Sequence, residues 1–124
     1  MQLSTNVQFF LETQMQLRIL HWQTKGFARH KAFGETYSDL DGLIDDFVEI
    51  SMGKYGRSSL SDSEKTLNLK NITELELGLF LKTIKGKLIE MTSQLSSDKD
   101  TDLLNLRDEM LGLTNKLTYL LTLE

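Results

Sequence analysis

Apolar residues recur at intervals of three and four along most of the chain, the spacing that places them on one face of an α-helix. The clearest stripe belongs to a helix expected over residues 74–95 and consists of Leu77, Phe80, Ile84, Leu88, Met91 and Leu95. The same spacing predicts three further helices, over residues 4–24, 29–54 and 102–121. There is no proline to interrupt them.

The connection between the second and third helices is long and rich in glycine, serine and charged residues, from Gly53 to about Ile72. A connection of about 18 residues is too long for a simple turn between antiparallel neighbours. It lets the two helices lie parallel, with a short helix expected near residues 61–67. Thr73 and Glu76 form a capping-box pattern where the third helix begins. We therefore predict an all-α, single-domain four-helix bundle over residues 1–124, with the long crossover of ferritin-like bundles.

Composition narrows the class of protein. Of the 124 residues, 40% are hydrophobic and 26% are charged, as in ordinary globular domains. Neither a membrane-spanning run nor a signal peptide is visible, so we expect a cytoplasmic protein without membrane contact. The absence of cysteine excludes disulfides and thiolate metal sites. A formal net charge of −4 argues against nucleic acid as a partner.

Four side chains are candidates for metal chemistry. The only two histidines, His21 and His30, lie on either side of a short turn at Gly26, each in register with an apolar stripe. Asp45 and Glu49 are four residues apart, so their carboxylates share a helix face. Imidazole and carboxylate together suit Fe(II), Mn(II) or Zn(II).

The spacing of these residues predicts that any shared site lies between two chains. His30 and Asp45 are 15 residues apart on one helix, or roughly 22 Å at the rise of an α-helix. Ligands of one ion must lie within about 2–2.5 Å of it. Two antiparallel copies of the second helix, related by an axis near Tyr37 and Ser38, would bring the histidines of one copy to the carboxylates of the other. This predicts a homodimer with two equivalent sites.

The run His21-Trp22-Gln23-Thr24-Lys25-Gly26, followed by His30, Asp45 and Glu49, resembles the signature of the Dps miniferritins. The resemblance covers about residues 15–50. It implies that His21, His30, Asp45 and Glu49 are the iron ligands and catalytic residues of a di-iron ferroxidase site between subunits. It also implies oxidation of Fe(II) by peroxide or oxygen, and iron storage in a homo-oligomeric shell of up to twelve chains.

A second interpretation remains open at this stage. An interior histidine is more often a hydrogen-bonded core residue than a ligand, and carboxylates on a helix are usually solvated charges. The bundle would then lack iron chemistry and act as a structural or protein-interaction module.

Overall fold

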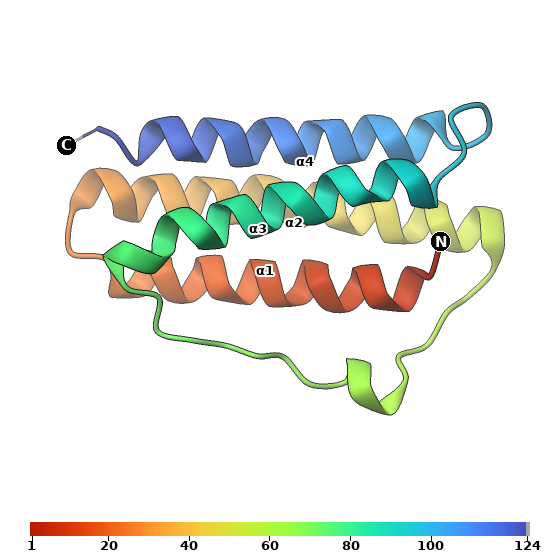
Figure 1. The fold of residues 1–124 in the computed structure, drawn as a ribbon, viewed down its shortest axis with the longest axis horizontal. Coiled ribbons are helices and arrows are strands. Elements are labelled where there is room, and N and C mark those ends of the chain that lie inside the picture. The colour runs from red at the N-terminus through yellow and green to blue at the C-terminus, as the bar shows by residue number, and fades with distance from the viewer. Residues whose placement is uncertain (124) are drawn as a thin grey trace.

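The computed structural model describes residues 1–123 and is a bundle of four helices (Figure 1). These are α1 (Leu3–Gln23), α2 (Phe27–Tyr55), α3 (Glu74–Gln94) and α4 (Thr101–Leu120). The prediction of an all-α four-helix bundle is confirmed, and every helix boundary lies within two residues of the predicted one. In the described part of the chain there is no strand, and no helix has the length and apolar character needed to cross a membrane.

The crossover from residue 56 to residue 73 sets the topology. It leaves the end of α2 and runs back along the outer side of α1, so α3 begins at the end of the bundle where α2 begins (Figure 1). The expected parallel arrangement of α2 and α3 is therefore present. The short helix in the crossover is a single 3₁₀ turn, η1 (Asp62–Glu64), shorter than the predicted one.

Side-chain hydrogen bonds fasten the crossover to α1. The carboxylate of Glu64 accepts hydrogen bonds from the hydroxyls of Ser4, at 3.1 Å, and Thr5, at 2.9 Å. The main-chain N–H and the hydroxyl of Ser61, together with Thr5, hold the pKa of Glu64 at about 2. Farther along, the amide of Gln16 bonds both the N–H and the carbonyl of Lys70. The crossover (residues 56–73), called the strap below, is thus attached to α1.

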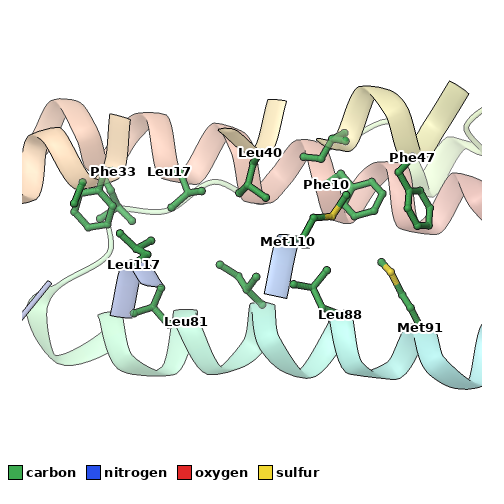
Figure 2. Close-up of a cluster of buried hydrophobic side chains, with 14 of the residues drawn as sticks. Phe10, Leu17, Phe33, Leu40, Phe47, Leu81, Leu88, Met91, Met110 and Leu117 are labelled. Carbon is green, nitrogen blue, oxygen red and sulfur yellow. The ribbon is translucent and has the colours of Figure 1, made fainter. Parts of the chain in front are cut away.

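The core is apolar and is supplied by all four helices (Figure 2). The rings of Phe10 and Phe47 meet edge to face, with centroids 5.2 Å apart. On α3 the buried positions alternate by four and three: Leu77, Leu81, Ile84, Leu88 and Met91. Phe80, expected in this stripe, is only half-buried, because Leu81 occupies the inward position one residue on.

The helices do not all have the same number of neighbours. α2 packs against α1 on one side and α4 on the other, whereas α3 packs mainly against α4. Between α1 and α3 lies a groove of about 200 Å³, lined by residues that include Phe9, Thr13, Phe80 and Ile84. One long side of α3 therefore borders open space.

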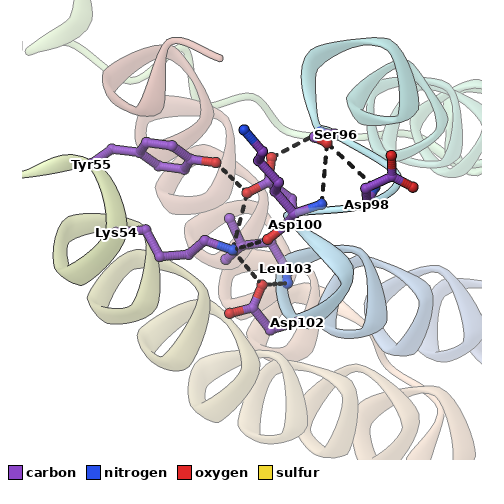
Figure 3. A network of polar contacts seen from close by, with 8 residues as sticks. Lys54, Tyr55, Ser96, Asp98, Asp100, Asp102 and Leu103 are labelled. Atoms are coloured by element: carbon purple, nitrogen blue, oxygen red, sulfur yellow. Dashed lines mark hydrogen bonds and ion pairs between the residues drawn. The ribbon is translucent and has the colours of Figure 1, made fainter.

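At the end of the bundle opposite the α1–α2 turn, a polar network joins α2 to the α3–α4 turn (Figure 3). Asp100 is only 3% exposed and accepts hydrogen bonds from the hydroxyl of Tyr55 and from the N–H of Ser96. The ammonium of Lys54 lies 3.1 Å from it and also contacts Asp102 at 2.8 Å. These donors, Tyr55 first, hold the pKa of Asp100 at about 2.

We expect Asp100→Asn to lower the free energy of unfolding at neutral pH by about 1–3 kcal/mol, because a buried charged acceptor with several donors is lost. The folded pKa lies below that of an unfolded aspartate, so wild-type stability should fall as pH drops from about 4 to about 2. Urea denaturation across that pH range should show a flatter profile for the variant. Asp98→Asn, on the exposed side of the same turn, is the control and should leave the profile unchanged.

Candidate functional site

The two histidines form a stacked pair across the seam between α1 and α2. Their ring centroids are 3.8 Å apart and their planes differ by 19°. His21 Nδ1 donates to the main-chain oxygen of His30 at 2.6 Å, and His30 Nδ1 donates to the main-chain oxygen of His21 at 2.7 Å. The carbonyl of His21 lies in the last turn of α1, where the helix itself supplies no partner. This histidine clasp (His21 and His30) therefore closes the turn between the two helices.

Gly34 makes the clasp possible. A Cβ atom built on Gly34 would lie 2.7 Å from Cε1 and 2.8 Å from Nδ1 of His21, closer than such atoms approach. The imidazole of His21 thus fills the space that a side chain at residue 34 would need. The sequence analysis missed this role, although a glycine inside a long helix is destabilising and is a signal of close packing.

The stacking of the two imidazole rings limits metal binding by the clasp alone. A metal ion binds in the plane of an imidazole ring, and two nearly parallel rings do not converge on one ion within coordination distance. Each ring keeps Nε2 available, and an Nδ1–H donated to a main-chain carbonyl is common in metal-binding histidines. The pair therefore cannot chelate one ion between its rings.

Three carboxylates gather farther along α2. Asp45, Asp46 and Glu49 are exposed, and one oxygen from each lies within 4.8 Å of the others. The negative charge of Asp45, followed by its hydrogen bond, raises the pKa of Glu49. Asp45 and Glu49 were expected to share a face, and they do. Asp46 was not among the candidates from the sequence, but its position three residues before Glu49 brings it into the group.

The structure of one chain does not unite the histidines with the carboxylates. α2 is continuous from Phe27 to Tyr55, so His30 and Asp45 lie about 22 Å apart along its axis. The site built from His21 and His30 of one copy and Asp45 and Glu49 of another remains a prediction, as do its iron and its dimer.

A partly exposed cation–aromatic stack adjoins the clasp. The guanidinium of Arg18 lies 4.3 Å from the ring centre of Tyr37 and 5.4 Å from that of Trp22. Trp22 is 68% exposed. The tryptophan therefore lies on the rim between α1 and α2, where a partner could cover it.

Comparison with known proteins gives a family but no activity. A sequence profile described as a family of unknown function (DUF5856) matches residues 21–121. An uncharacterized 14.6 kDa protein from the mobD–ri intergenic region of Enterobacteria phage T4 is 28% identical over 119 residues, which cover 92% of this chain and 83% of the phage protein. No solved structure matches the chain significantly.

The predicted membership of the Dps miniferritins is wrong. The profile that matches, over most of the chain, is that of a different family, and the phage relative carries no iron-related description. The resemblance rested on a His-Trp pair, a glycine turn and two carboxylates. Two antiparallel helices joined by a short turn offer such positions without iron chemistry, and here the histidines bond the main chain.

We expect Gly34→Ala to destabilise the protein by about 1–3 kcal/mol, because the added methyl displaces His21 and breaks its hydrogen bond. Gly112→Ala, in α4 with nothing within 4 Å of the added Cβ, should instead stabilise it by about 0.5–1 kcal/mol. Urea denaturation of both variants measures this difference.

The same substitution in a His21→Ala background tests the cause. With the imidazole removed, Gly34→Ala should no longer destabilise. An equal loss of stability in both backgrounds would show that Gly34 acts independently of the clasp.

Proposed function

The chain belongs to DUF5856, a family of unknown function, and we propose from its geometry that it is a protein-interaction module that works as a homodimer. The proposal is carried by one observation: a stripe of exposed residues on α2 runs from a basic residue to acidic ones, so it is complementary in charge to an antiparallel copy of itself.

One stripe on the outer face of α2 changes sign along its length, and Glu35, Asp39 and Asp41 beside it are exposed and acidic. Lys31, Ser38, Gly42, Asp45 and Glu49 are all exposed and follow one another at helical spacing. The first is basic, the middle residues are small, and the last two are acidic. A face with this order can pair with an antiparallel copy of itself, since each end then meets the opposite charge.

A two-fold axis at Ser38 makes the pairing specific. Lys31 and Asp45 lie seven residues on either side of Ser38, so Lys31 would face the partner's Asp45, and the reverse contact would repeat it. Gly42, four residues after Ser38, has nothing within 4 Å of an added Cβ and so leaves room for the partner helix. Gly34, four residues before Ser38, is covered by the imidazole of His21 and does not add to this opening.

The existing contact of Lys31 leaves its ammonium group free for such a pairing. Lys31 lies 3.9 Å from Glu35, and both side chains are largely exposed. A contact of this kind contributes at most about 1 kcal/mol, so Lys31 can exchange it for the partner's Asp45. Trp22, on the rim of the face, would lose exposure on dimerisation and so report on it.

Charge reversal tests the pairing. Lys31→Glu and Asp45→Lys should each weaken the dimer about tenfold, because each places like charges opposite one another twice per dimer. The double variant restores the attraction and should restore the dimer. Analytical ultracentrifugation gives the dissociation constants, and the fluorescence of Trp22, the only tryptophan, follows the same transition.

Lys116→Glu is the matched control, because Lys116 is exposed on α4, away from this face. It should leave the dissociation constant unchanged. A double variant that dimerises no better than either single variant would contradict the proposed pairing.

Divalent metal binding is the second candidate function, and the three clustered carboxylates favour it. Asp45, Asp46 and Glu49 offer oxygen ligands suited to Fe(II) or Mn(II), and imidazole from His21 and His30 would add affinity for Zn(II). The pairing about Ser38 brings the carboxylates of one copy toward the clasp of the other. Oxidation of Fe(II) at this place would be the enzymatic form of the same site.

Anaerobic titration with Fe(II), Mn(II) and Zn(II), followed by peroxide, tests this candidate. Asp45→Asn and Glu49→Gln should weaken binding at least about tenfold, and Lys31→Glu should weaken it as well if the site lies between copies. Binding that is lost in the carboxylate variants but retained in Lys31→Glu would place the ion within one chain. Absence of metal binding by the wild type would reject the second candidate function and leave the protein-interaction module as the proposal.

A further inference from the structure

Three large apolar side chains lie on the outer face of α3, and no element of the described residues 1–123 covers them. Leu75 is 96% exposed, Leu79 is 68% exposed and Ile89 is 56% exposed. With Lys82 and Gly86 they follow the same alternation by four and three as the buried stripe, displaced to the opposite side of the helix. A helix that is apolar on two opposite sides normally has a neighbour on each, but α3 packs mainly against α4.

We propose that this outer face binds a second copy of the same helix, antiparallel, about a two-fold axis at Lys82. The inference does not rest on the pairing through α2. It concerns a different helix, and α2 and α3 are not neighbours in the bundle.

The sequence on either side of Lys82 fits an antiparallel copy of itself. Leu75 and Ile89 lie seven residues before and after it, so each apolar side chain would meet the other in the partner. Gly78 and Gly86 lie four residues before and after, and neither has an atom within 4 Å of an added Cβ. These glycines leave room for the partner helix to approach and for Leu79 to pack over the partner's Gly86.

Charge on the flank of this face is also complementary. Glu76 and Lys87 both line the groove between α1 and α3, at opposite ends of the stripe. In the antiparallel pair, Glu76 of one copy and Lys87 of the other fall at nearly the same height along the helix axes. Glu76 would therefore lie beside the partner's Lys87. The reverse contact would place the partner's Glu76 beside Lys87.

The axis itself carries the one unfavourable contact. Two copies of Lys82 would meet there, and their ammonium groups would have to turn away to water along the flanks. From Leu75 to Ile89 the face is only about 21 Å long. The association should therefore be weak and concentration-dependent, and relieving the charge at Lys82 should strengthen it.

Sedimentation velocity over a wide concentration range, with helicity checked by circular dichroism, tests the inference. Leu79→Glu should weaken the α3 association at least about tenfold, and Lys82→Leu should strengthen it at least about tenfold, since an apolar contact replaces a like-charge pair. Both residues are exposed in the monomer, so neither change should unfold it. Leu69→Glu, an exposed leucine on the crossover, is the control and should change nothing.

Combining these variants with Lys31→Glu separates the two interfaces. If both exist, the wild type forms assemblies larger than a dimer, each single disruption leaves dimers, and Leu79→Glu with Lys31→Glu leaves the 14.2 kDa monomer. Self-association that is insensitive to both Leu79→Glu and Lys82→Leu would overturn the α3 inference, whatever happens at α2. Association that responds to those two changes but not to Lys31→Glu would support α3 and reject α2.

Discussion

The long crossover is the constraint on which the arrangement of the bundle depends. The chain must return from Tyr55, at one end of α2, to Glu74 at the other, a distance comparable to the length of α3, about 32 Å. It does so along the outer side of α1, held by Glu64, Gln16 and their partners. The last part of the strap lines the groove between α1 and α3 with Asn68, Lys70 and Ile72. α3 itself has α4 as its main neighbour.

The short turn that joins α1 to α2 places a second constraint on the bundle. The turn leaves little room between two long helices, and the histidine clasp fills it with two imidazoles and two main-chain hydrogen bonds. Residues that resemble metal ligands by spacing are thus already engaged in holding the helices together. Spacing along a helix reports which side chains share a face, but it does not report which atoms are already bonded.

The contrast between the helices and the histidine clasp explains how much of the structure could be predicted from the sequence. The alternation of apolar residues, the capping box at Thr73 and the glycine-rich crossover were sufficient to predict four helices and their order, because each depends on neighbouring residues. The stacking of His21 on Gly34 depends on where α1 lies against α2, which no local pattern contains. Exposure behaves in the same way: Leu75 and Leu79 lie outside the predicted stripe, but only the packing of α3 shows that both remain largely exposed.

The single-sided packing of α3 also has a consequence for motion. Stability in a bundle is not uniform, and elements with few buried contacts open first in the native state. α3 buries one stripe in the common core, has α4 as its main neighbour, and is preceded by a strap held through polar side chains. α2 packs against α1 and α4 and is held at its two ends by the histidine clasp and by Asp100. The strap and α3 therefore form the natural opening unit, and hydrogen exchange should proceed through it while α1, α2 and α4 stay protected. A second copy bound to α3 would oppose the opening of that unit. Assembly would therefore change the lifetime of the folded state as well as the number of chains in the particle.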